Sequence, residues 1–292
     1  LAERNLWSGD CMTQRGAVFI GPTIINLDFP APEQDILPGV RWGRIEAFPS
    51  PAYWAYQILA RRLEVNAVNY KLGRTLKEEV GACLLGGHGI PAAIGLAAFN
   101  KLKDCGAFDA QPPSEATLYE WLSEPIKTGN KSVRYRFARQ KSRYLSVALN
   151  RLDVEMPPTD SGRALRDWLT SIPGIGHKTA SWIARNWLCA DDVAILDIHI
   201  LRAGLLAGFF TGDLTVERDY LKLEQIFLEF SEAMGVKASE LDALIWYEMQ
   251  ASSSTVFSLI ENMRDQPLAK LRPRSSRAKN RQSGTSQTTF QF

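Results

Sequence analysis

Residues 172–202 read IPGIGHKTASWIARNWLCADDVAILDIHILR, and this stretch predicts a glycine hairpin between two helices. The hairpin is Pro173–Gly176, Lys178 falls in the first turn of the helix after it, and Asp197 precedes a further helical pattern. Glycines let the backbone turn sharply, and N–H groups at the start of the next helix attract a phosphate. The segment therefore predicts a grip on a nucleic-acid backbone. A tight turn between two helices is the alternative for the hairpin alone.

Lys178 is a residue type that can attack a sugar carbon, and Asp197 is one that can stabilise the positive charge that develops on the sugar. A lysine at the positive end of a helix dipole is disfavoured as an ammonium ion, and a neutral amine is a Schiff-base nucleophile. Lys178, Trp182 and Arg185 share a predicted face away from the apolar stripe of their helix. Asp197 is a predicted N-cap, and a fixed carboxylate stabilises the positive charge of glycosidic cleavage. A phosphate-binding lysine and a purely structural cap are the alternatives.

This pattern resembles the helix-hairpin-helix (HhH-GPD) DNA glycosylase superfamily. The resemblance rests on specific motifs over residues 165–202 and is moderate over residues 51–262. The superfamily includes endonuclease III, MutY and the 8-oxoguanine DNA glycosylases. Endonuclease III and most MutY proteins carry four clustered cysteines after the catalytic helix, whereas the four cysteines here are scattered. A lysine without that cluster indicates the 8-oxoguanine DNA glycosylase/AP lyase branch.

The resemblance implies a mainly α, two-lobed helical fold and excision of 8-oxoguanine from double-stranded DNA. Lys178 would attack C1′ and form an imine with the opened sugar, and β-elimination of the 3′ phosphate would follow. Asp197 would stabilise the sugar cation and help to take a proton from Lys178. No catalytic metal or other cofactor is implied, and a structural monovalent cation at the hairpin carbonyls is left open.

A glycosylase must also extrude its target base and hold it by stacking and hydrogen bonds. Trp182 is one candidate stacking surface. Trp246 is a second, because residues 241–247 look like the C-terminal helix of the compact archaeal 8-oxoguanine glycosylases. Core packing is the alternative for both. His88 occupies the place of the family residue that fills the vacated position, but the stretch GGHGIP departs from the family pattern, and helix capping is its alternative.

The net charge is only +2, but its distribution is uneven. Residues 127–151 contain eight Lys or Arg and no acid, which indicates a face that follows phosphates, with a solvated surface as the alternative. The region from 264 to 292 contains seven Lys or Arg and one acid. The predicted DNA contacts are Gly174, Gly176, His177, His88 and Arg143.

The predicted domain organisation has three parts. Residues 1–50 form an N-terminal arm or small β element, with strands expected at Ala17–Asn26 and Val40–Phe48. Residues 51–264 form the helical glycosylase domain, and 265–292 a disordered basic tail that has too few apolar residues to fold.

We expect a cytoplasmic protein, because no secretory signal is visible and the cysteines suit a reducing compartment. A nucleoid-associated monomer is the expected form. The long apolar runs are interrupted by glycine, proline or charged residues, which favours core helices over membrane spans. The alternatives are a glycosylase for another damaged or modified base, a catalytically silent DNA-binding module, and a structural or regulatory protein that keeps only the fold. Borohydride trapping on damaged DNA distinguishes them.

Overall fold

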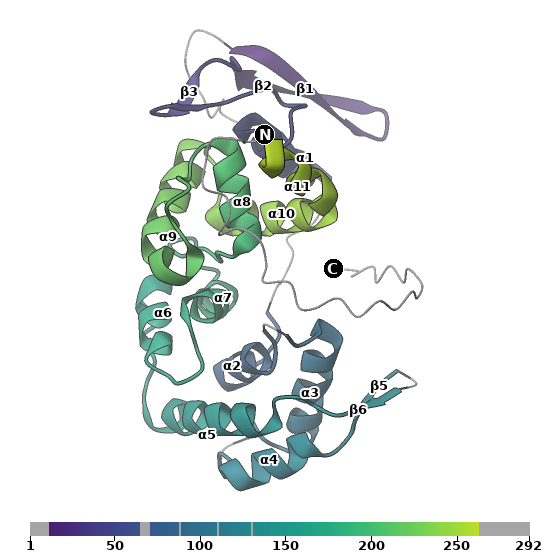
Figure 1. The fold of residues 1–292 in the computed structure, drawn as a ribbon, viewed down its shortest axis with the longest axis vertical. Helices are drawn as coiled ribbons and strands as arrows, with labels where there is room; N and C mark the ends of the chain where they lie inside the picture. Colours follow the sequence, from purple (N-terminus) through teal and green to yellow (C-terminus); the bar gives the residue numbers. More distant parts are fainter. Residues whose placement is uncertain (1–11, 65–70, 88, 110, 130, 263–292) are drawn as a thin grey trace. The chain divides into compact units, whose positions relative to one another are not determined.

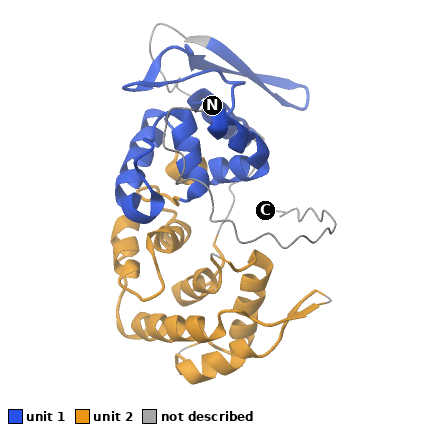
Figure 2. Cartoon of the chain, in the orientation of Figure 1, with its two compact units in different colours: residues 1–68, 197–236, 243–292 blue, residues 69–196, 237–242 orange. Residues whose placement is uncertain are grey.

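The computed structural model describes residues 12–64, 71–87, 89–109, 111–129 and 131–262. These ranges contain eleven helices and six short strands, which confirms the predicted mainly α fold class (Figure 1). They form two compact units, coloured separately in Figure 2. The predicted basic tail and His88 lie outside the described residues.

Unit 2 comprises residues 69–196 and 237–242. Its helices carry an apolar core in which Leu84, Leu102, Leu145 and Leu165 are fully or almost fully buried. Side chains of Thr75, Ser114 and Ser161 cap three of the helices by accepting backbone N–H bonds. Its elements are α2 (Leu76–Leu85), α3 (Ala92–Asp104), α4 (Glu115–Ser123), β5 (Ile126–Thr128), β6 (Lys131–Val133), α5 (Ala138–Val154), α6 (Gly162–Thr170) and α7 (His177–Leu188).

Unit 1 comprises residues 1–68, 197–236 and 243–292. Its core includes the buried Trp54 and a stacked pair, Phe209 and Phe230, with ring centroids 4.0 Å apart. The first strand contacts the first helix of this unit (Figure 1). Its elements are β1 (Met12–Ile20), β2 (Thr23–Pro30), β3 (Asp35–Leu37), β4 (Val40–Arg41), α1 (Pro51–Glu64), α8 (Ile198–Ala207), α9 (Val216–Ala233), most of α10 (Ala238–Ala251), and α11 (Ser253–Asn262).

Both strand predictions near the N-terminus are wrong in their bounds. Residues 17–26 are not one strand but the two sides of a hairpin, in which β1 and β2 pair antiparallel. The reversal falls at Gly21, whose φ of +56° is in the left-handed region that favours glycine. The second predicted strand ends at Arg41, because the following residues form turns closed by backbone hydrogen bonds such as Ala47 N–H to the Arg44 carbonyl at 3.0 Å.

No helix within the described ranges is both long enough and apolar enough to cross a membrane.

Candidate active site

The predicted hairpin joins two helices that pack on each other, α6 and α7. Ile172 and Ile175 are buried and hold the hairpin on the core of unit 2, and the Ile175 N–H donates to the Ile172 carbonyl at 3.1 Å. Gly174 and Gly176 are exposed. The predicted helix-hairpin-helix arrangement is therefore confirmed.

The two hairpin glycines are needed for different reasons. Gly174 has a φ of +88°, and a Cβ at this position would overlap the ring of Tyr144 in α5. Gly176 has an ordinary φ of −90°, and a Cβ there would meet nothing within 4 Å. Gly174 is therefore required by the fold, whereas Gly176 keeps the approach to the start of α7 open.

The first turn of α7 contains His177 and Lys178, both half-buried. The ladder of this helix begins where the Ala180 N–H donates to the Gly176 carbonyl at 2.9 Å. The N–H groups of a first turn have no acceptor within their own helix, and the N-cap Gly176 offers no side chain to bond them. The positive end of the helix dipole thus lies at Lys178.

One part of the helical-face prediction is confirmed and one part is wrong. Trp182 is 40% exposed, as expected for a residue on the face of Lys178. Arg185 is not on an outer face: only 7% of it is exposed, and its guanidinium forms an ion pair with Asp242. A buried arginine is stable when it is paired and hydrogen-bonded, and that partner comes from a distant part of the sequence.

The pair of Arg185 and Asp242 belongs to a buried polar network in unit 2. The second oxygen of the Asp242 carboxylate accepts the Ile195 N–H at 2.9 Å. Next to Arg185, the Asn186 amide donates to Glu79 at 3.1 Å. The network therefore ties α7 both to α2 and to the segment that leads to Asp197. Adjacent polar residues on the inward side of a helix are the signal that could have revealed it.

Two consecutive carboxylates fix the segment between α7 and α8. Asp191 accepts hydrogen bonds from the hydroxyl of Ser239 at 2.5 Å and from its N–H at 3.3 Å. Asp192 accepts the N–H groups of Gly162 and Arg163, at 3.1 and 3.0 Å, at the start of α6. Neither carboxylate was assigned a role from the sequence.

Asp197 is the N-cap of α8, as predicted. Its carboxylate accepts the N–H groups of His199 at 2.8 Å and Ile200 at 3.3 Å. Arg202 is almost completely buried one turn further along, with its guanidinium 4.6 Å from the ring centroid of Phe257. Burial lowers the pKa of Arg202, and the negative charge of Asp197 acts in the opposite direction. The cap therefore has a charged neighbour.

Trp246 lies in the part of α10 that belongs to unit 1 and is 39% exposed. Its ring meets the His199 ring edge-to-face, with centroids 6.3 Å apart. Sequence reasoning did not single out His199, although its place two residues after Asp197 in the motif LDIH was a usable signal. Core packing alone does not describe either tryptophan, because both rings are partly exposed.

The predicted site residues are divided between the units. Unit 2 holds the hairpin glycines, His177, Lys178, Trp182 and Arg143, and unit 1 holds Asp197 and Trp246. Arg143 is exposed on α5, one residue before Tyr144, whose ring packs at Gly174. The assignments of these residues to roles stay predictions.

No group of three or more His, Cys, Asp or Glu side chains in the described ranges is arranged to hold a metal ion.

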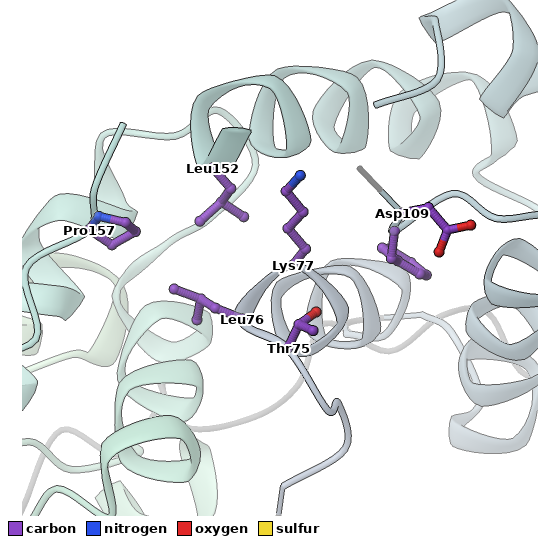
Figure 3. A pocket seen from close by; sticks show the side chains of 7 residues that line it. Thr75, Leu76, Lys77, Asp109, Leu152 and Pro157 are labelled. Carbon is purple, nitrogen blue, oxygen red and sulfur yellow. The ribbon is translucent and has the colours of Figure 1, made fainter. Parts of the chain in front are cut away.

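Unit 2 also has a shallow pocket of about 410 Å³ at the start of α2 (Figure 3). Lys77 in its wall is bonded to Asp153 at 2.6 Å, and none of the predicted site residues lines it. The pocket is therefore separate from the hairpin and its helix. Its lining residues are Thr75, Leu76, Lys77, Phe108, Asp109, Leu152 and Pro157.

Comparison with known proteins identifies the family. A family model described as 8-oxoguanine DNA glycosylase matches residues 68–236. The 8-oxoguanine DNA glycosylase/AP lyase of Methanocaldococcus jannaschii is 33% identical over 130 residues, which is 42% of this chain and 62% of that protein. The protein of the same name from Saccharolobus islandicus is 32% identical over 141 residues, which is 45% of this chain and 67% of that protein.

Among solved structures, the crystal structure of the M. jannaschii 8-oxoguanine DNA glycosylase matches with a TM-score of 0.47 and 28% identity, over 60% of this chain and 78% of that one. The family model alone covers more than half of the sequence, and it includes the hairpin, Lys178 and Asp197. The chain therefore belongs to the helix-hairpin-helix family of 8-oxoguanine DNA glycosylases.

Proposed function

We propose that the protein is a bifunctional DNA glycosylase/AP lyase that removes 8-oxoguanine from double-stranded DNA. The observation that carries this proposal is the family match over residues 68–236, which contains a lysine at the second position after the hairpin. The relatives from M. jannaschii and S. islandicus carry the name of that activity. The roles proposed for Lys178, Asp197 and the two tryptophans rest on their residue types and local surroundings.

The start of α7 is suited to hold a DNA phosphate. Backbone N–H groups of the first turn point out of the helix, and the helix dipole favours an anion there. Gly176 leaves room for a phosphate oxygen, because no Cβ stands in the approach. Such contacts set the position of the DNA and carry no sequence information. We assign His177 and Arg143 to the same backbone contact.

Lys178 is the proposed nucleophile. Its neutral amine forms a bond to C1′ of the damaged nucleotide, and the bond from C1′ to the base breaks with both electrons going to the base, which then takes up a proton. Opening of the sugar ring gives an imine with Lys178. Loss of a C2′ proton then expels the 3′ phosphate by β-elimination, and water releases the enzyme.

Asp197 is the proposed electrostatic partner of this chemistry. Its carboxylate is oriented by two backbone N–H groups of α8, so it needs no rearrangement to act. A fixed anion stabilises the positive charge that develops on the sugar as the base departs. Trp182 and Trp246 are the proposed stacking surfaces for the extruded base, because partly exposed aromatic rings are available for that contact.

Borohydride trapping on a panel of duplexes with different damaged bases tests the proposal. We expect a covalent complex with the 8-oxoguanine duplex, and its loss in Lys178→Gln. Lys101→Gln is the matched control, because Lys101 is bonded to Glu124 at 2.8 Å on another helix and should trap normally. Trapping only with a different lesion would replace 8-oxoguanine by that lesion as the assigned substrate. Binding of DNA without any trapping would refute the lyase activity.

Asp197→Asn addresses the second residue. Asparagine keeps a side-chain oxygen for the N-cap, so we expect the fold and DNA binding to be retained. Base removal in single-turnover assays should fall by orders of magnitude, because the charge that stabilises the sugar cation is lost. A single-turnover rate equal to that of the wild type would remove Asp197 from the mechanism.

A further inference from the structure

Six exposed cationic side chains lie on β5–β6, on the segment that joins β6 to α5, and on the first part of α5, and we call this set of residues the α5 basic face. Figure 1 shows the β5–β6 hairpin projecting from the helices of unit 2. The surface lies within the acid-free run of residues 127–151. Its members are Lys127, Lys131, Arg134, Arg136, Arg139 and Arg143.

These six side chains differ from other cations of unit 2 in their surroundings. Lys101, Lys103 and Arg151 form ion pairs with Glu124, Glu78 and Glu155, at 2.8, 2.9 and 2.6 Å. In the ranges that the structure describes, no member of the α5 basic face has an acidic side chain as a partner. An excess of one sign with no internal compensation raises the local concentration of anions.

Two members of the α5 basic face, Arg139 and Arg143, lie in α5 itself and are four residues apart, a spacing that places their side chains on the same side of the helix. Arg136 lies in the turn just before this helix. The Arg136 guanidinium lies 5.2 Å from the Phe137 ring centroid, and that of Arg139 lies 5.9 Å from the ring of Tyr119. Contacts with aromatic rings restrict these long side chains before any ligand arrives.

One member of the α5 basic face, Arg143, is next in sequence to a residue that packs on the glycine hairpin. Tyr144 follows Arg143, and its ring packs where a Cβ of Gly174 would stand. The Gln140 amide, between the arginines, donates to the Tyr144 hydroxyl at 3.2 Å. Lys141 is different from its neighbours, because it is half-buried with its amine 3.4 Å from the Gly86 carbonyl. The α5 basic face and the glycine hairpin therefore belong to the same unit and are linked through Arg143 and Tyr144.

We propose that the α5 basic face binds the phosphate backbone of the duplex that flanks the damaged base, and that it extends this contact from the phosphate assigned to Arg143 and the start of α7. This inference rests on the proposed function, because it needs DNA to be the ligand of the hairpin. A duplex presents one negative charge for about every 1.7 Å of its axis, so a surface with six cations can contact several phosphates. Arginine also binds phosphate through two parallel hydrogen bonds.

The test is the salt dependence of binding to an undamaged duplex, measured with the full chain. In the triple variant Arg134→Gln, Arg136→Gln, Arg139→Gln we expect weaker binding. The slope of log K against log salt should become shallower by about 0.9 for each phosphate that the variant no longer neutralises. Lys101→Gln and Arg218→Gln are the matched controls, because their cations already pair with Glu124 and Asp219. Both controls should keep the wild-type slope.

A second variant and a second measurement make the outcome decisive. Lys127→Gln with Lys131→Gln alters only the short hairpin and should also reduce the slope, even if the triple variant were poorly folded. In a separate set of duplexes that contain 8-oxoguanine, stepwise shortening on each side of the damaged base should remove the difference in affinity between wild type and variant from one side only. An unchanged slope in both folded variants would overturn the inference, and would favour a partner other than DNA or a solvated surface.

Failure of the proposed function gives a different result. If wild-type protein traps no damaged duplex, the lyase assignment fails, while the slope on undamaged DNA still reports on the α5 basic face. If trapping succeeds and the slopes do not change, the enzyme assignment stands and the flanking contact is wrong.

Discussion

Replacing Asp242 by asparagine removes the negative charge that compensates the buried Arg185. The substitution keeps the size of the side chain and an oxygen that can accept the Ile195 N–H, which Asp242 holds at 2.9 Å. Asp242 is only 2% exposed and Arg185 only 7%, so water cannot replace the lost partner. The perturbation is therefore the loss of the Asp242 charge next to a guanidinium in the protein interior.

The size of the effect follows from this burial. Breaking a buried ion pair by removing one partner costs about 3–5 kcal/mol, because the remaining charge stays desolvated. The asparagine oxygen still offers a weaker hydrogen bond, so we expect the lower end, about 3 kcal/mol. For domains of roughly 150–250 residues, about 2–4 °C of melting temperature corresponds to each kcal/mol, so a loss of roughly 6–12 °C is expected.

The assay is urea denaturation followed by circular dichroism and by fluorescence, since two compact units need not unfold together. Glu124→Gln is the control: it breaks the pair with Lys101, but Glu124 is 60% exposed, and exposed pairs contribute at most about 1 kcal/mol. The double variant Arg185→Met, Asp242→Asn should recover much of the stability, because it removes both charges and keeps the oxygen that accepts the Ile195 N–H. A loss below about 1 kcal/mol in Asp242→Asn, equal to the control, would refute the reasoning.

Three further substitutions have effects that the structure predicts. Gly174→Ala should lower stability by about 1–3 kcal/mol, because its positive φ strains alanine and a Cβ overlaps the Tyr144 ring. Gly176→Ala should leave stability unchanged and weaken DNA binding in a titration, because its added Cβ meets only the space proposed for a phosphate; unchanged affinity would argue against that contact. Burial alone would raise the pKa of Glu78, but hydrogen bonds from the Arg74 N–H and Lys103 lower it overall. The ionised carboxylate therefore stabilises the fold above the ordinary carboxyl pKa, and this is lost as the pH falls through the lowered value. Glu78→Gln should make the melting temperature less sensitive to acid, and parallel pH profiles for the two proteins would contradict this.

Local sequence signals predicted much of the fold and part of the candidate site. The hairpin at Pro173–Gly176 and the cap at Asp197 depend on interactions within a few residues, and both were predicted from residue type and spacing. The helix from Pro51 to Glu64 was predicted with the same bounds, because a capping Ser50 and a proline at the first position define its start.

Features that depend on distant residues could not be predicted in this way. Arg185 was placed on an exposed face because helical spacing alone groups it with Lys178, and its partner Asp242 lies far along the sequence. The β5–β6 hairpin was missed, because strands of three residues are too short for an alternating pattern. The resemblance implied two lobes, but the bounds of the two units could not be predicted, since unit 2 includes residues 237–242, which follow a long stretch of unit 1 in the sequence.

The position of Asp242 in the sequence limits how far the protein can be shortened. The match to the family stops at residue 236, six positions before Asp242, whose carboxylate forms the ion pair with Arg185 of α7. A fragment cut where the similarity ends would also lose Ser239, the donor to Asp191. The contacts that hold unit 2 together therefore continue beyond residue 236, where the family match ends. Shortened versions of the protein should keep the beginning of α10.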